Sequence, residues 1–125
     1  MIREIVFAAT AIALVAFVPA PAKASEATSG DTTCSVMRTM AKNAMLWRQR
    51  DRSVSDYMAK HIEIIDRATV TENVKGGLRT MVRIYAMEAY AEPVYMTPEF
   101  KQNIIEQFAN EKEAECYRVV LKDTI

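Results

Sequence analysis

Residues 33–50 read Thr-Cys-Ser-Val-Met-Arg-Thr-Met-Ala-Lys-Asn-Ala-Met-Leu-Trp-Arg-Gln-Arg. Apolar side chains recur along this stretch in steps of three and four residues. They lie on one stripe, which runs through Cys34, Met37, Met40, Ala41, Ala44 and Trp47. A repeat of about 3.6 residues is typical of an amphipathic helix that buries one face. The stretch therefore predicts a helix, and it places Cys34 on the face that the helix buries.

A second helix is predicted over residues 54–67. The charged turn Gln49-Arg50-Asp51-Arg52 ends the first helix, and Ser53 follows as a candidate N-cap. A serine at this position accepts a hydrogen bond from the backbone of the first helical turn. Apolar residues then recur at helical spacing as far as Ile65.

The third predicted helix has the widest apolar face. Thr71 is a plausible N-cap, and Pro93 ends the helix because proline lacks a backbone donor and clashes with the preceding turn. Ile84 and Met87 lie beside the main stripe and widen it, so we expect this helix to be the central and most buried one. The main stripe comprises Leu78, Met81, Val82, Tyr85 and Ala89.

Gly76 and Gly77 fall inside the third helical pattern. Each glycine in a helix interior costs about 1 kcal/mol relative to alanine. Two interpretations stay open: the helix begins after the pair, or a neighbouring backbone approaches closely there.

The fourth helix has the clearest start. Thr97-Pro98-Glu99 supplies an N-cap oxygen, a proline at the first helical position and a carboxylate at the positive end of the helix dipole. Its helical pattern continues to about residue 120, and no alternating strand pattern of useful length occurs in the chain. The sequence therefore predicts an all-α fold, a small bundle of about four helices over residues 33–122.

The first 24 residues are expected to be a cleaved signal peptide. Arg3 precedes an uncharged apolar run over residues 5–18, and Ala22-Lys23-Ala24 is a small-x-small cleavage pattern. The alternative is a retained anchor, but 14 apolar residues form a helix of about 21 Å, shorter than a bilayer core. Residues 25–32 are small and polar, which is typical of a flexible lead-in.

Cys34 and Cys116 are the only cysteines. An exported chain enters an oxidising compartment, so an even cysteine count predicts a disulfide. Closing a loop of about 80 residues removes roughly 4–5 kcal/mol of unfolded-chain entropy. Two separate thiols are the alternative, and a zinc site fits poorly because His61 is the only histidine.

Charge argues against several partners. Without Arg3, Lys23 and Glu4, the exported part keeps 14 basic and 15 acidic residues. A chain so balanced has no bulk attraction to nucleic acid or to an anionic membrane.

The charged residues are unevenly distributed along the chain, because those in residues 33–52 are mainly basic and those in residues 98–118 mainly acidic. The first and fourth helices are therefore expected to place opposite charges along a shared seam.

No combination of residues indicates catalysis. His61 has no histidine or carboxylate four residues away, and the chain has no nucleophile elbow, phosphate loop or dinucleotide fingerprint. Carboxylate pairs such as Glu88 with Glu92 are typical of solvated helix faces. We therefore expect no enzyme and no cofactor.

Thioethers such as those of Met37 and Met40 can bind soft metal ions. Methionine at core positions is, however, more typical of packing, so we predict no metal site.

The candidate partner surface is the end of the first helix. Tryptophan and arginine dominate the binding energy of many interfaces. The alternative is that Trp47 anchors the core while the arginines interact with the negative end of the helix dipole. The candidate residues are Trp47, Arg48, Gln49, Arg50 and Arg52.

Several short motifs lie between residues 34 and 117. They are Met45-x-x-Arg48-Gln49, Ala89-Tyr90 followed by Pro93, Thr97-Pro98-Glu99-Phe100, and Phe108 with Cys116 downstream. With these motifs the chain resembles a group of small uncharacterised exported helical proteins of proteobacteria that have paired cysteines. The resemblance implies a secreted helical domain and brings no activity or site residues with it.

The function expected from these features is that of a non-enzymatic periplasmic or secreted binding or accessory protein. Its partner is expected to be another protein, met through a helical surface, as for an inhibitor, an immunity factor or an envelope-complex subunit. The alternatives are a carrier of a soft metal or small ligand and a periplasmic stress chaperone.

Overall fold

The computed structural model describes residues 29–124, which form four helices. These are α2 (Ser29–Gln49), α3 (Val54–Arg67), α4 (Glu72–Tyr90) and α5 (Pro98–Thr124). No strand occurs within these residues, so the predicted all-α class and the four-helix architecture are confirmed. The predicted signal peptide and residues 25–28 of the predicted lead-in lie outside the described residues.

Capping side chains begin three of the helices where the sequence predicts them. Ser53 Oγ accepts a hydrogen bond from Asp56 N at 3.1 Å, and Thr71 Oγ1 accepts one from Val74 N at 3.3 Å. Thr97 Oγ1 accepts from Phe100 N at 3.2 Å. Each bond satisfies a backbone donor that has no partner inside its own helix.

Helix α2 begins at Ser29, four residues before the predicted start. Residues 29–32 are therefore helical rather than part of a lead-in. The reason is tertiary packing against the far end of α5. Tyr117 donates a hydrogen bond to Asp31 at 3.0 Å, and a side chain at Gly30 would lie 2.9 Å from Val120.

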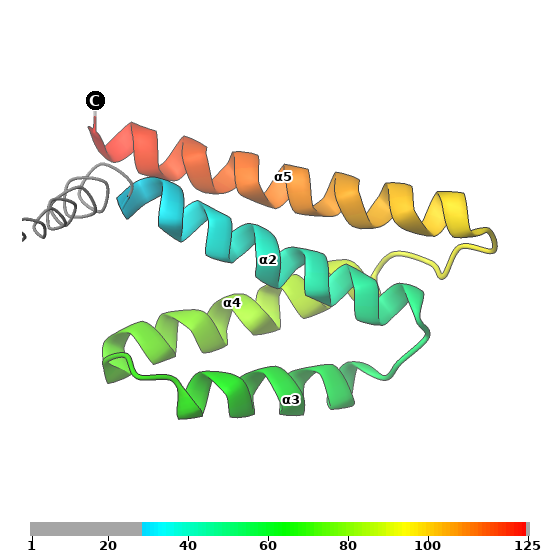
Figure 1. The fold of residues 1–125 in the computed structure, drawn as a ribbon, viewed down its shortest axis with the longest axis horizontal. Coiled ribbons are helices and arrows are strands. Elements are labelled where there is room, and N and C mark those ends of the chain that lie inside the picture. Colours follow the sequence, from blue (N-terminus) through cyan, green and yellow to red (C-terminus); the bar gives the residue numbers. More distant parts are fainter. Residues whose placement is uncertain (1–28, 125) are drawn as a thin grey trace, which may run out of the picture.

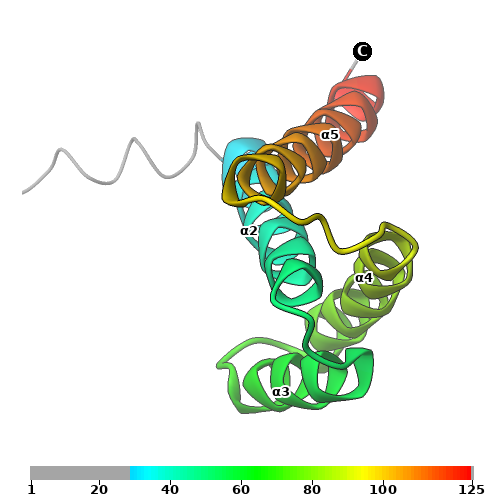
Figure 2. The same cartoon turned by 90° about the vertical axis from the view of Figure 1, so that its right-hand side faces the viewer.

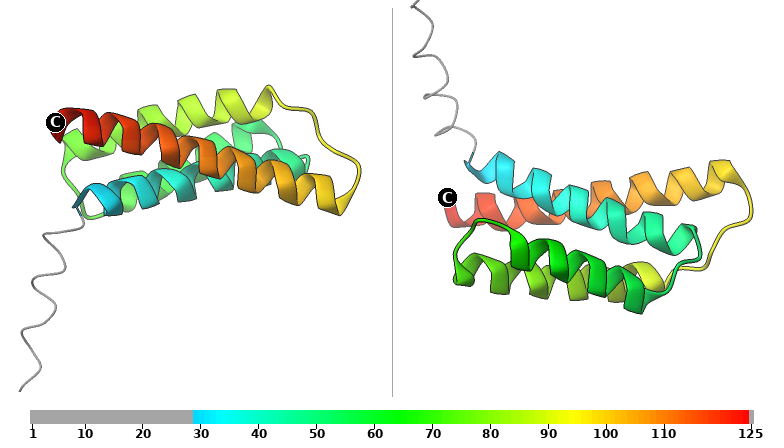
Figure 3. Two further views of the ribbon diagram at one scale, coloured as in Figure 1. Left: turned by 90° about the horizontal axis from the view of Figure 1, so that it is seen from above. Right: turned by 60° about the horizontal axis from the view of Figure 1, so that its bottom comes forward.

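The central helix is α2, and the prediction that the third helix is central was wrong. Helix α2 packs against α3, α4 and α5, whereas the backbones of α4 and α5 come close at few points. Figure 1 shows α2 between α5 above and the α3–α4 hairpin below. In Figure 2, α4 and α5 diverge from α2, and in Figure 3, α5 runs antiparallel to α2 along most of its length.

Small side chains explain the central place of α2. Ala41 and Ala44 are fully buried on α2, and Ala86 and Ala89 are fully buried on α4. Without long side chains at these positions, the two backbones can approach each other closely. The wide apolar face of α4 is only partly used, since Ile84 and Met87 are exposed.

The disulfide fastens α2 to α5. Cys34 is fully buried and bonds Cys116, with the Cα atoms 5.4 Å apart and a sequence separation of 82 residues. The predicted pairing is confirmed. It joins the first turns of α2 to the last turns of α5, at the end of the bundle opposite the α4–α5 connection (Figure 1).

The predicted charge seam also forms between α2 and α5. Arg38 pairs with Glu106 at 2.9 Å and with Glu113 at 3.3 Å, and Lys42 pairs with Glu106 at 2.9 Å. The hydrogen bond from Lys42, together with the nearby charge of Arg38, holds the pKa of Glu106 below its ordinary value. Because these pairs are partly exposed, each adds little to the stability of the fold. Their main effect is to favour α5 as the neighbour of α2.

Gly76 and Gly77 fit neither interpretation that the sequence left open. Helix α4 begins at Glu72 and runs through both glycines. A Cβ atom built on either one meets no heavy atom within 4 Å, so no neighbouring backbone comes close. The cap at Thr71 and the packing of α4 from Leu78 onward hold this turn in the helix.

Candidate functional site

Gln49, the last residue of α2, holds the α4–α5 connection in place. Its side-chain nitrogen donates to Pro93 O at 2.8 Å, and its side-chain oxygen accepts from Tyr95 N at 2.9 Å. The residue is only 3% exposed. A buried amide that supplies both a donor and an acceptor to an irregular segment satisfies backbone groups that would otherwise lack partners.

Three further side-chain hydrogen bonds join the end of α2 and the residues after it to this segment or to the helix ends that flank it. Arg48 Nε donates to Glu92 O at 2.7 Å, and Lys101 Nζ donates to Gln49 O at 2.8 Å. Tyr90 donates its hydroxyl proton to Arg52 O at 2.7 Å. The connection over residues 91–97 is therefore held directly by Arg48 and Gln49 of α2, and Tyr90 and Lys101 fix the helix ends on either side of it.

The end of α2 itself has a defined shape. Asp51 has a φ of 56°, in the left-handed region where aspartate is one of the more tolerated residues. The backbone N–H groups of Asp51 and Arg52 donate to the carbonyls of Arg48 and Trp47, at 2.9 and 3.1 Å. This pair of bonds is a Schellman motif, which ends the helix and turns the chain toward α3.

Trp47 serves both the core and the surface. Its ring meets the rings of Tyr57 and His61 edge-on, at 5.9 and 5.6 Å between centroids. On its outer side the Arg52 guanidinium lies 4.0 Å from the ring centroid, a cation–π contact. Burial lowers the pKa of His61, which favours the neutral imidazole within this aromatic cluster.

Beyond the clamped segment, apolar side chains face solvent. Met96 is 91% exposed and Phe100 is 60% exposed. The Tyr95 ring lies 6.4 Å from that of Phe100. Arg50 and Arg52 are exposed at the same end of the bundle. We call this set the tip surface: Arg50, Arg52, Tyr95, Met96 and Phe100.

The predicted partner surface is thus only partly available. Gln49 is buried, and Arg48 donates a hydrogen bond to the backbone of Glu92. These two residues therefore support the surface from within and do not offer their polar groups to a partner. Arg52 covers Trp47, and Arg50 is exposed. The sequence prediction missed Met96 and Phe100. The signal for Met96 was the pair Pro93 and Pro98, which marks a short irregular segment that exposes its side chains. Phe100 lies in the first turn of α5, where no local pattern signals its exposure.

Between α4 and α5, Lys112 forms a partly buried ion-pair cluster with Glu88 and Glu115. Its Nζ lies 2.8 Å from Glu88 Oε1 and 3.2 Å from Glu115 Oε1. Burial opposes the charged form of Lys112, but its hydrogen bonds to the two carboxylates outweigh this effect and raise its pKa. Lys112 is therefore charged at all physiological pH values.

Within residues 29–124, no three His, Cys, Asp or Glu side chains lie together as a metal site. None of the four described helices combines the length and the apolar character that a membrane span needs. The sequence matches no family model, and neither a curated protein nor a solved structure is similar to it. The resemblance to exported proteobacterial proteins stays a prediction.

Proposed function

We propose that this chain is a non-enzymatic binding or accessory protein that recognises another protein through its tip surface. The observation that carries the proposal is the contrast between the clamped backbone of residues 92–95 and the nearly complete exposure of Met96. Holding an irregular segment rigid reduces the entropy that binding must overcome. A rigid support for exposed apolar and aromatic side chains is what a protein interface requires.

The composition of the tip surface favours a protein partner with an apolar pocket and carboxylates at its rim. Met96 and Phe100 supply apolar area, and Tyr95 supplies an aromatic ring with a polar end. Arg50 and Arg52 supply forked donors suited to carboxylates. The near-zero net charge of the chain gives no support to nucleic acid as the partner.

We place this activity in the periplasm or outside the cell. The disulfide requires an oxidising compartment for its formation. The apolar leader over residues 5–18 and the cleavage pattern at Ala22-Lys23-Ala24 support export with removal of the leader.

The test is site-specific photo-crosslinking in cells that express the full-length gene. A photoreactive residue at Met96 is expected to give a discrete crosslinked species that mass spectrometry identifies as one protein. The control position is Leu121, which is 55% exposed near the other end of α5. Arg50→Glu is expected to reduce the crosslinked yield at Met96 without changing the urea unfolding midpoint.

Two outcomes would contradict the proposal. One is the absence of any discrete species at Met96. The other is the same species at equal yield from Met96 and Leu121, because that result indicates non-specific capture.

A further inference from the structure

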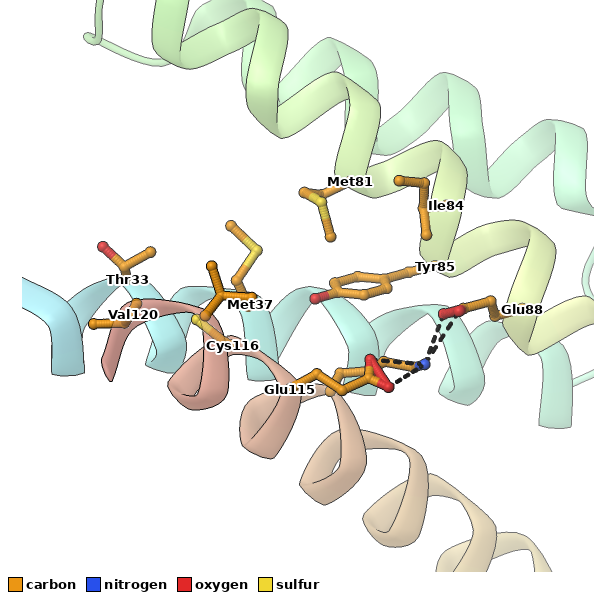
Figure 4. Close-up of a pocket in the computed structure, with 11 residues that line it drawn as sticks. Thr33, Met37, Met81, Ile84, Tyr85, Glu88, Glu115, Cys116 and Val120 are labelled. Carbon is orange, nitrogen blue, oxygen red and sulfur yellow. Dashed lines mark hydrogen bonds and ion pairs between the residues drawn. The ribbon is translucent and has the colours of Figure 1, made fainter. Parts of the chain in front are cut away.

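A cavity of about 310 Å³ opens between α2, α4 and α5, where α4 and α5 diverge. Figure 4 shows its lining, and the Cys34–Cys116 disulfide contributes to one wall through Cys116. Its volume is at the small end of the range of ligand pockets. The apolar lining residues are Met37, Met81, Ile84, Cys116, Val119 and Val120.

Tyr85 places a polar group in this apolar space. The residue is only 4% exposed, and its hydroxyl points into the cavity toward Met37 (Figure 4). The neighbouring ring of Phe108 meets the Tyr85 ring edge-on, at 6.3 Å between centroids. Unlike the hydroxyl groups of Tyr57 and Tyr90, that of Tyr85 has no hydrogen-bond partner among the described residues. A buried polar group without a partner is costly, and a phenylalanine would fill the same space.

The charged groups that line the cavity have a negative sum. Lys112 is held between Glu88 and Glu115, so one positive charge faces two carboxylates (Figure 4). The two glutamates are 42% and 52% exposed along their side chains and have room for another cationic partner. Tyr85 lies close enough to Lys112, Glu88 and Glu115 for all three charges to influence the pKa of its hydroxyl group.

We propose that this cavity binds a small amphipathic amine, with an apolar body among the methionine, isoleucine and valine side chains and a cationic head beside Glu115. The head of a primary amine has three donors. In this proposal one donor bonds the oxygen of the Tyr85 hydroxyl and the others bond the carboxylate of Glu115, since the single charge of Lys112 is shared between Glu88 and Glu115. An anionic head is disfavoured, because it would lie beside an excess of negative charge.

This site does not depend on the proposed protein-binding function. The cavity is built from Tyr85, Glu88 and Glu115 on α4 and α5, whereas the tip surface lies where α2 ends and α5 begins. Methionine methyl signals can distinguish binding at the cavity from binding at the tip surface, since Met37 and Met81 line the cavity and Met96 lies on the tip surface.

The test compares octylamine, octanol and octanoate, which share one chain and differ in the charge of the head. The protein is expressed from the full-length gene and purified with its disulfide formed. Binding is followed by the methionine methyl signals in NMR. Octylamine is expected to shift Met37 and Met81 but not Met96, and to bind at least fivefold more tightly than octanol, with octanoate weakest.

Two variants and one control address the named groups. Glu115→Gln is expected to weaken octylamine at least fivefold and to leave octanol within twofold, while Lys112 keeps its partner Glu88. Tyr85→Phe is expected to weaken octylamine at least threefold without lowering stability, because the hydroxyl has no bond to lose. Glu111→Gln removes the same charge one turn earlier on α5, outside the cavity lining, and is expected to leave all three affinities unchanged.

The proposal is overturned if none of the three probes binds, or if octanol or octanoate binds as tightly as octylamine. It is also overturned if Met96 shifts in place of Met37 and Met81, or if Glu111→Gln acts as strongly as Glu115→Gln. Concentration-dependent dimerisation that protects Met37 and Met81 would assign the cavity to a second copy of the chain instead.

Discussion

At the residue scale, the role of Gln49 in the fold differs from the role that its sequence context suggests. In the sequence it stands among arginines at a helix end and looks like part of an exposed binding surface. In the fold its amide is buried and completes the hydrogen bonding of Pro93 and Tyr95. No periodic pattern signals this role, because both partners lie more than 40 residues away along the chain.

We predict that Gln49→Met lowers the free energy of unfolding by about 2–4 kcal/mol. Methionine has a similar length but leaves Pro93 O and Tyr95 N without partners, and each orphaned buried group costs about 1–3 kcal/mol. Urea unfolding of the oxidised protein measures the effect. Gln107→Met, at an exposed position of α5, is the matched control and should change stability by less than about 0.5 kcal/mol. Equal effects of the two variants would contradict the clamp.

At the element scale, the starts of three helices can be predicted from the sequence, whereas the packing neighbours of each helix cannot. The caps at Ser53, Thr71 and Thr97 depend on residues within the same turn, so the sequence shows them directly. Which helix lies in the middle depends on how closely helices pack. The small residues of α2 allow contacts on several sides, whereas the more apolar α4 keeps Ile84 and Met87 exposed.

The glycines of α4 give the prediction for this scale. Gly76→Ala and Gly77→Ala should each raise the free energy of unfolding by about 0.5–1 kcal/mol, because alanine restricts the unfolded chain and neither site has a neighbour within 4 Å. Chemical denaturation measures the gain. Gly30→Ala is the control and should give no gain, since its Cβ would lie 2.9 Å from Val120. A loss of stability at Gly76 or Gly77 would show that the turn needs glycine.

At the scale of the whole molecule, the backbones of α4 and α5 come close at few points, and both helices pack against α2. Side chains bridge the space between them, as in the Lys112–Glu88 ion pair and the Tyr85–Phe108 ring contact. The disulfide fixes one end of the α2–α5 pair, and the hydrogen bond from Lys101 to the backbone oxygen of Gln49 fixes the other. This arrangement keeps α4 and α5 apart along one side, which is where the cavity around Tyr85 lies. A compact bundle with four mutually packed helices would have filled that space.

Loss of the disulfide should therefore affect the whole domain. We predict that the double variant Cys34→Ser/Cys116→Ser loses about 4–5 kcal/mol of unfolding free energy, which is the loop-closure estimate for a loop of this length. Thermal or urea unfolding with and without reductant measures it. Reductant should destabilise the native protein and leave the double variant unchanged. A loss of less than about 1 kcal/mol would show that helix packing alone sustains the fold.

The sequence by itself determined the helical class, the start of three helices, the cysteine pairing and the sign of the α2–α5 charge seam. These features depend on neighbours a few residues apart, or on residues with few possible partners, such as two cysteines in one chain. Only the tertiary structure decided that α2 is central, that Gln49 is buried while Met96 is exposed, and that Tyr85 faces an open cavity. Those features depend on the relative placement of helices distant in sequence, and local periodicity carries no information about that placement.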